Sequence, residues 1–225
     1  MTTPTASAWS PVTDATVLYL IRHGATAANL AAPPRIQGRR SDPPLVAEGI
    51  RQAEEAAALL AGRPVVACYS SPLLRAVQTA ELVARPHRLP VVPLDPLTEC
   101  DAGAWDGLDW GAVRAIDPDG YARFHADPAA FGYPGGESYA DVHTRAAPAL
   151  AELLERHAGR AVVVVAHHVV NRTYLAGLLG LPPGQARRVV LGNGAVSVVV
   201  RQGDRTTVRT LAAMARSEER ESGTE

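Results

Sequence analysis

The stretch LIRHGATAAN, residues 20–29, places an arginine and a histidine directly after a short apolar run. Val17–Ile21 contains β-branched and aromatic residues and ends at a polar turn, which predicts a buried strand. Ligands of open α/β sheets bind at the carboxyl ends of the strands. Arg22 could there hold an anion, His23 could act as a nucleophile, and Gly24 would let backbone N–H groups approach the ligand. For the dipeptide alone an ordinary strand end is the favoured interpretation, and the rest of the chain reverses it.

Strands and helices are predicted to alternate along the chain. Further strands are expected at residues 65–69, 91–94, 161–166, 194–201 and 206–211, and helices at 47–61, 71–84, 110–116, 138–158 and 169–179. Ala161–Ala166 is the most apolar run and is therefore the expected central strand. This pattern predicts an α/β fold, a three-layer sandwich whose mostly parallel central sheet carries helices on both faces. A single domain is expected over residues 14–213, with residues 1–13 and 214–225 as flexible tails.

Several helix signals are specific enough to test. Ser71 is the predicted N-cap of its helix, with proline at the first helical position. Ser138 begins a capping box, Glu137 is expected to help cap the same helix, and Pro148 should kink it. Ile50 is expected on the buried face of the first long helix. Residues 98–136 are the least regular part of the chain and are predicted to cover the site.

Composition limits the class of protein. The chain has 225 residues, of which 47% are hydrophobic and 20% are charged, and its net charge is −1. These values are typical of a globular protein and give no indication of a nucleic-acid or membrane surface. The absence of a signal peptide or membrane-length apolar run makes the cytoplasm the expected compartment. Cys68 and Cys100 are expected to be free thiols, with Cys100 a bystander.

All 22 basic residues are arginine, and the chain contains no lysine. Walker A phosphate loops, Schiff-base enzymes and pyridoxal-phosphate enzymes all need a lysine and are therefore excluded. Any phosphate must be held by arginine, histidine and backbone groups.

Three predicted strands are followed by the same kinds of residue. The first ends at Arg22 and His23, the second leads to Arg75 in the first turn of a helix, and the central one ends at His167 and His168. If these strands are parallel neighbours, arginines and histidines meet in one pocket, which a helix N-terminus makes more positive. This combination predicts a phosphate site.

The chain resembles the histidine phosphatase superfamily, which includes the cofactor-dependent phosphoglycerate mutases. The resemblance lies in the motifs RHGxTxxN at 22–29, SPLxRAxQTA at 71–80, LxE at 97–99, GxWxG at 103–107, GGES at 135–138 and VxH at 165–167. It covers residues 17–200 in the order of the family and implies a phosphoglycerate mutase-like fold.

The resemblance also implies residue roles. His23 would accept the phosphoryl group, and Glu99 would protonate the leaving alkoxide and later activate water. Arg22, Arg75 and His167 would stabilise the transferring group, so no metal and no cofactor are implied. Thr26 and Asn29 would make secondary phosphate contacts.

Two departures from the family pattern concern the substrate. His168 stands where the family usually has glycine, which brings a titratable side chain near the pocket and makes it a candidate substrate contact. The loop after Gln37 is longer than usual and carries Arg39 and Arg40, either as substrate ligands or as solvated charges. His167 and His168 do not form a convincing zinc site, because adjacent side chains point apart and no partner pattern supports them.

Hydrolysis of a small phosphate monoester is the favoured function. The mutases carry a long, lysine-containing insertion after the glutamate motif, whereas 30 residues separate Gly107 from Glu137 here. Mutase-type phosphoryl transfer and a non-catalytic module that binds phosphorylated ligands are the alternatives. The sequence leaves the identity of the monoester and the oligomeric state open, and a homodimer is possible.

Overall fold

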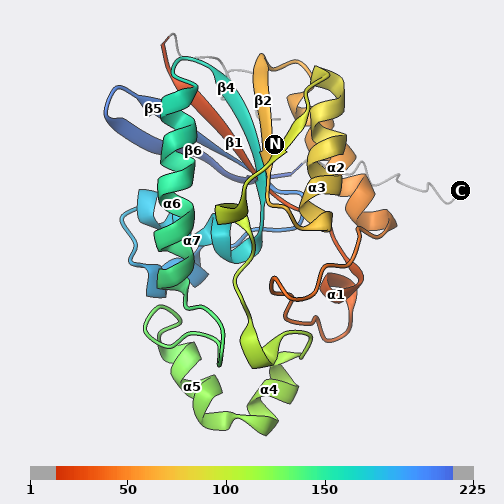
Figure 1. Cartoon of the computed structure of the whole chain (residues 1–225), viewed down its shortest axis with the longest axis vertical. Helices are drawn as coiled ribbons and strands as arrows, with labels where there is room; N and C mark the ends of the chain where they lie inside the picture. The colour runs from red at the N-terminus through yellow and green to blue at the C-terminus, as the bar shows by residue number, and fades with distance from the viewer. Residues whose placement is uncertain (1–13, 215–225) are drawn as a thin grey trace, which may run out of the picture.

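Six strands form a mixed sheet in the order β3-β2-β4-β1-β5-β6 (Figure 1). The strands are β1 (Thr16–Arg22), β2 (Val65–Ser70), β3 (Val91–Pro93), β4 (Ala161–Ala166), β5 (Val196–Gln202) and β6 (Arg205–Ala213). Strands β1 to β4 are parallel to one another, whereas β5 pairs antiparallel with β1 and β6 pairs antiparallel with β5. This computed structural model describes residues 14–214, so the predicted tails lie outside the described residues except for Met214.

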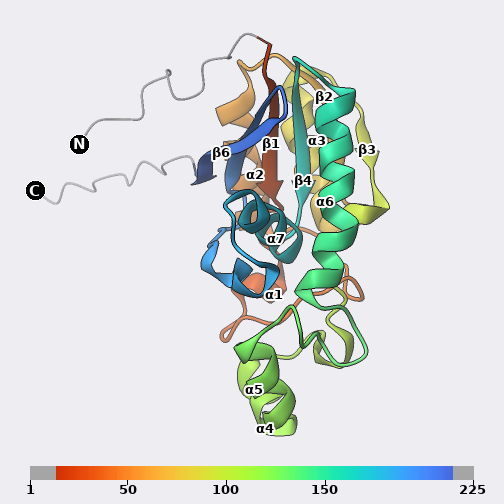
Figure 2. The same ribbon diagram turned by 90° about the vertical axis from the view of Figure 1, so that its left-hand side faces the viewer.

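Helices cover both faces of the sheet, which confirms the predicted three-layer α/β architecture (Figures 1 and 2). Helices α2 (Ala47–Leu60) and α3 (Leu74–Ala84) pack on one face, and α6 (Tyr139–Arg156) and α7 (His168–Leu178) pack on the other. The remaining helices are α1 (Ala27–Leu30), α4 (Trp110–Ile116) and α5 (Pro118–Ala126), with 3-10 turns at Arg85–His87, Asp95–Leu97, Gly103–Trp105 and Pro183–Arg188.

Side chains of the central strands alternate between the two cores, as the twofold repeat of a strand requires. Leu18 and Leu20 of β1 join the core under α6 and α7, whereas Tyr19 and Ile21 join the core under α2 and α3. All six residues of β4 are buried, and β4 pairs with both β1 and β2. Full burial stabilises the fold by about 1.5–3 kcal/mol for each valine. The prediction of a central strand at residues 161–166 is confirmed.

The loop after β1 meets α2 backbone to backbone. A Cβ atom at Gly24 would lie 2.2 Å from the Gly49 carbonyl oxygen, and one at Gly49 would lie 2.1 Å from the Ala25 carbonyl oxygen. Because Gly49 makes this contact, Ile50 is turned outward and its side chain is 42% exposed. The prediction that Ile50 lies on the buried face was therefore wrong.

Helix α3 begins later than predicted. It starts at Leu74, and Ser71 is not its N-cap, because the Ser71 hydroxyl accepts from the Leu73 N–H at 3.3 Å and contacts His167. The carboxylate of Asp42, 32 residues away, accepts from the Leu74 N–H at 2.8 and 2.9 Å instead. A distant loop thus satisfies a helix end that local sequence was expected to cap.

Helices α4 and α5 form a lobe beyond the carboxyl ends of the parallel strands (Figure 2). An aromatic cluster supports the lobe, with Trp105 packed edge-on against Trp110, Phe124 and Tyr133 at centroid distances of 5.5–6.1 Å. The predicted helix at residues 110–116 is confirmed. Helix α5 was missed, although the Asp117 side chain caps it by accepting from the Gly120 N–H at 2.9 Å. No helix within residues 14–214 is long and apolar enough to cross a membrane.

Candidate active site

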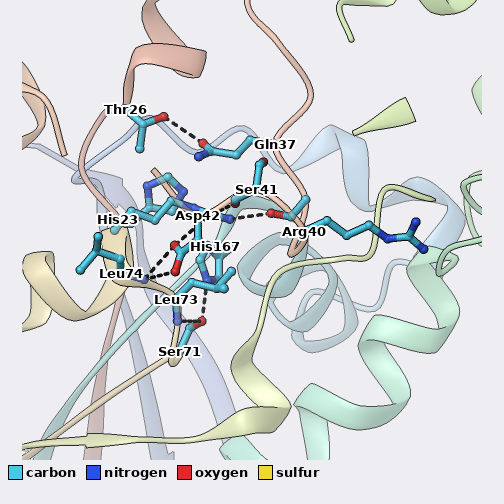
Figure 3. A network of polar contacts seen from close by, with 12 residues as sticks. His23, Thr26, Gln37, Arg40, Ser41, Asp42, Ser71, Leu73, Leu74 and His167 are labelled. Atoms are coloured by element: carbon cyan, nitrogen blue, oxygen red, sulfur yellow. Dashed lines mark hydrogen bonds and ion pairs between the residues drawn. The ribbon is translucent and has the colours of Figure 1, made fainter. Parts of the chain in front are cut away.

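The parallel pairing of β1, β2 and β4 brings three strand ends together. Arg22 pairs with Ala166, and Ser70 pairs with Val165, so the residues that follow each strand meet at one edge of the sheet. The fold thus shows the predicted convergence: Arg22 and His23 lie next to the segments that begin at Ser71 and His167. Figure 3 shows His23 and His167 close to one another, with Ser71 beside His167.

His23 is buried and its ring has a defined tautomer. Nδ1 lies 2.7 Å from the Gly24 carbonyl oxygen, which can only accept a hydrogen bond. The hydrogen of a neutral ring therefore sits on Nδ1, and Nε2 carries the free electron pair that a nucleophile needs. Burial, together with the positive charges of Arg75 and Arg22, holds the pKa of His23 well below its usual range. His23 is accordingly neutral and nucleophilic around neutral pH.

His167 faces His23 with 5.1 Å between the ring centroids. Its Nε2 lies 2.7 Å from the Ser71 hydroxyl, which itself accepts from the Leu73 N–H. This arrangement favours donation by Ser71 to Nε2 and leaves the hydrogen of His167 on Nδ1. Burial, followed by the charge of Arg75, lowers the pKa of His167 well below its usual range. His167 can therefore donate to an anion as a neutral group.

Arg22 and Arg75 are both buried and are oriented by backbone carbonyl groups. Arg22 Nη1 donates to the Leu191 carbonyl at 2.7 Å, whereas Arg75 donates to the carbonyls of Ser41 and Gly38 at 2.9 and 3.0 Å. Burial lowers the pKa of Arg22 to about 10, which leaves the guanidinium charged at neutral pH. Two fixed positive charges thus flank the histidines.

Three donor nitrogens of this cluster are buried without a hydrogen-bond partner in the described part of the chain. They are Nε of Arg22, Nε of Arg75 and Nδ1 of His167. A buried donor without an acceptor costs about 1–3 kcal/mol, which a bound anion would recover. Donors from three segments around one nucleophilic imidazole fit the equatorial oxygens of a phosphoryl group.

Glu99 is buried at the side of the same site. One carboxylate oxygen accepts from the Cys100 N–H at 2.8 Å, and the other accepts from the Val169 N–H at 3.3 Å. Both Glu99 and His23 line the cavity described below. Glu99 is therefore placed where a general acid and base would serve the ligand of His23.

Arg145 of α6 is a positioning residue that the sequence did not reveal. It donates to the carbonyls of Pro96, Thr98 and Glu99 at 2.8, 2.7 and 3.2 Å. The same guanidinium binds both carboxylate oxygens of Glu137 at 2.7 and 2.9 Å, and Glu137 also accepts from the Asp101 N–H. The capping role predicted for Glu137 was thus wrong: the Ser138–Asp141 capping box is complete without it.

A cavity of about 570 Å³ opens at His23. Three of the predicted substrate contacts line it: Arg22, Asn29 and His168. Thr26 is fully buried and does not line the cavity, and its hydroxyl donates to the Asn29 side-chain oxygen at 3.1 Å. Thr26 is therefore placed to hold Asn29.

Arg39 and Arg40 lie outside the cavity lining and pair with a carboxylate. Their Nε atoms are 3.3 and 2.7 Å from the two oxygens of Asp101, and Arg40 also donates to the Gly135 carbonyl. These contacts join two loops and favour a structural role for both arginines. Of the two alternatives left by the sequence, the substrate-ligand alternative has no support from this placement.

Cys100 lines the cavity but is not an activated thiol. Burial and the neighbouring charge of Glu99 raise its pKa above the usual range, and burial raises the pKa of Cys68 to about 12. Both thiols are free. Within residues 14–214, no group of three His, Cys, Asp or Glu side chains is placed to hold a metal ion.

Known proteins share both the sequence pattern and the fold. Phosphoserine phosphatase 1 of Hydrogenobacter thermophilus is 32% identical over 194 residues, covering 86% of this chain and 90% of that protein. A protein of Proteus mirabilis named "Probable phosphoglycerate mutase GpmB" is 33% identical over 183 residues, covering 81% of this chain and 83% of its own. The native structure of mycobacterial glucosyl-3-phosphoglycerate phosphatase superposes with a TM-score of 0.79 at 30% identity, covering 88% of this chain and 99% of that one.

The family model described as "Histidine phosphatase superfamily (branch 1)" matches residues 18–213, which is nearly the whole described chain. The match spans the strand ends that carry Arg22, His23, Arg75 and His167. The chain therefore belongs to branch 1 of the histidine phosphatase superfamily.

Proposed function

We propose that this protein hydrolyses small phosphate monoesters through a phosphoryl group carried on His23. The observation that carries the proposal is the set of three buried, unpartnered donors on Arg22, Arg75 and His167 beside a neutral imidazole. A phosphoryl group there would satisfy all three donors in a site with little water. The phosphatases among the relatives support the same reaction class.

The first chemical step transfers the phosphoryl group to the protein. The electron pair of His23 Nε2 forms the nitrogen–phosphorus bond as the bond between phosphorus and the ester oxygen breaks. Glu99, protonated at that moment, gives its proton to the departing alkoxide, and the alcohol leaves. Arg22 and Arg75 stabilise the charge on the equatorial oxygens throughout.

The second step releases phosphate. The Glu99 carboxylate takes a proton from a water molecule, whose oxygen forms a new bond to phosphorus as the nitrogen–phosphorus bond breaks. His23 regains its electron pair, and inorganic phosphate leaves. Proton transfers and charge stabilisation are all supplied by residues of the chain, so the reaction proposed here runs without a metal ion.

Mutase-type transfer is the second candidate, because a mutase is named among the relatives. Retention of a bisphosphorylated intermediate needs a cationic clamp over the site. The 29 residues between Gly107 and Glu137 contain α4 and α5 but no lysine, and their two arginines, Arg114 and Arg123, lie outside the cavity lining. This segment therefore supplies no clamp that would retain a bisphosphorylated intermediate. Water can then attack the phosphoryl group on His23 before a second acceptor does, which favours hydrolysis.

The direct test is turnover of p-nitrophenyl phosphate in the presence of EDTA at pH 5–8. We expect release of nitrophenol by the wild type and none by His23→Ala, with His87→Ala, altered outside the cavity, as the matched control. Absence of turnover would favour a non-catalytic module that binds phosphorylated ligands. Interconversion of phosphoglycerates faster than phosphate release would favour the mutase.

A further inference from the structure

The cavity carries more positive charge than one phosphoryl group needs. Among the described residues, its lining includes four arginines, Arg22, Arg35, Arg172 and Arg187, and one carboxylate, Glu99. None of these arginines forms an ion pair within 4.0 Å of a carboxylate in residues 14–214. Unpaired guanidinium groups in a concave site concentrate anionic ligands. Arg22 belongs to the phosphoryl site, which leaves the others to be explained.

Arg172 is the most buried of these remaining cations. It extends from α7, its exposure is 9%, and its Nε atom is buried without a hydrogen-bond partner in the described chain. Nη1 lies 3.5 Å from the Tyr139 hydroxyl, and Nη2 contacts His168 Nε2. A charged group buried without a counter-ion is costly, which indicates a ligand that supplies the missing negative charge.

His168 holds Arg172 without neutralising it. Its Nε2 can accept from Arg172 only as a neutral imidazole. Burial, and then the charge of Arg22, keeps the pKa of His168 far below its usual range, so the ring stays neutral. The side chain thus orients the guanidinium and leaves its full charge for a ligand. The glycine that the family usually has at this position could not do this.

Arg187, in the 3-10 turn that follows α7, also lines the cavity, and aromatic rings support it. Its guanidinium carbon lies 5.0 Å from the Phe124 ring centroid and 5.8 Å from that of Trp110. Cation–π contacts of this kind orient a guanidinium while leaving its charge uncompensated by a carboxylate. The remaining positive charge of the cavity therefore comes from α7 and the turn Pro183–Arg188, and the lobe formed by α4 and α5 supplies the rings that support Arg187.

We infer that Arg172, oriented by His168 and Tyr139, binds a second anionic group of the substrate. The preferred substrates are then phosphate monoesters that also carry a carboxylate or a second phosphate. This inference rests on the proposed function and narrows it to one substrate class. Arg172 is the specificity-determining contact, and His168 is a positioning residue.

Matched substrates test the inference on the wild-type protein. O-phosphoserine and O-phosphoethanolamine differ by one carboxylate, and fructose 1,6-bisphosphate and fructose 6-phosphate differ by one phosphate. We expect kcat/KM to favour the member with the extra anion by about tenfold to a hundredfold in at least one pair, as for a charged hydrogen bond. The pair that shows the preference identifies the second anion as carboxylate or phosphate.

Substitution then tests whether Arg172 causes the preference for the substrate with the extra anion. In Arg172→Gln, the ratio of kcat/KM values within the preferred pair should fall towards one, whereas in Arg188→Gln, altered at an exposed arginine outside the cavity lining, it should stay at the wild-type value. If Arg172→Gln does not fold, Arg172→Lys replaces it. Lysine keeps the charge but lacks the planar fork, so a reduced ratio is still expected.

The outcomes separate this inference from the proposed function. If the wild type hydrolyses both members of each pair equally well, phosphatase activity stands and the second-anion site is wrong. The assignment to Arg172 is also wrong if the preference survives unchanged in the substituted protein. If the wild type hydrolyses none of these esters and no p-nitrophenyl phosphate, the proposed function itself fails.

Discussion

Arg75 illustrates how a single residue makes a buried positive charge available to a ligand. Two of its nitrogens donate to neutral carbonyl oxygens, those of Ser41 and Gly38, and its closest carboxylate contact is Asp42 at 3.5 Å. Neutral acceptors fix the direction of the guanidinium without cancelling its charge. The Nε donor that remains is therefore held ready for an anion.

Removal of this group should be costly for the reaction. We predict that Arg75→Ala lowers kcat/KM for p-nitrophenyl phosphate by about a hundredfold or more, as for the loss of one oxyanion donor. Arg85→Ala, at the exposed end of the same helical segment, is the matched control and should retain wild-type kinetics. A change of less than about threefold in Arg75→Ala would show that this arginine does not contact the transferring group.

At the scale of elements, Arg145 connects helix α6 to the loop that carries Glu99. Residues 96–99 have no strand or long helix to fix them, yet three of their carbonyl groups bind one guanidinium on α6. Glu137 completes the arrangement by binding Arg145 and the Asp101 N–H. The GGES motif thus acts through Arg145 to position Glu99.

We predict that Arg145→Met lowers kcat by about tenfold to a hundredfold with a smaller change in KM, because the proposed mechanism uses Glu99 in the chemical step. Three loop carbonyls and the Glu137 carboxylate would lose their donor, so the thermal midpoint should fall as well. Arg156→Met, in the last turn of the same helix, removes an exposed arginine and should leave both values unchanged. Unaltered kcat in Arg145→Met would mean that Glu99 is placed without this arginine.

Local patterns in the sequence predicted the elements but not the contacts between distant segments. Continuous apolar runs in Val17–Ile21 and Ala161–Ala166 identified the central strands, because a strand that is buried on both faces is apolar at every position. The Asp42 cap of α3 spans 32 residues, and the Arg145 contacts span up to 49. Contacts across such distances follow no characteristic spacing in a single sequence. The start of α3 and the role of Glu137 were therefore both mispredicted.

Burial of three histidines affects the stability of the whole molecule. The pKa values of His23, His167 and His168 all lie below the ordinary value in the folded protein. The unfolded chain therefore binds protons that the folded protein excludes once the pH falls below about 6.5. Stability from these groups is complete above that pH and is lost as the pH falls below it.

We predict that the free energy of unfolding in urea decreases from pH 7 to pH 5 in phosphate-free buffer. Each neutral buried histidine contributes a slope of about 1.4 kcal/mol per pH unit below its unfolded pKa. Three such groups give up to about 4 kcal/mol per pH unit, and His168→Gln should remove about a third of this slope. A free energy of unfolding that stays constant over this range would contradict the burial of neutral histidines.

The proposed mechanism of the whole molecule requires a covalent phosphoryl group on His23. The protein would be denatured rapidly, without acid, during turnover of a monoester that is radiolabelled in its phosphate. Peptide mapping would then locate the label. We predict a label on the peptide that contains His23, stable in alkali, lost in acid, and absent from His23→Ala. Turnover by the wild type without such a label, or with the label on another residue, would contradict the central claim.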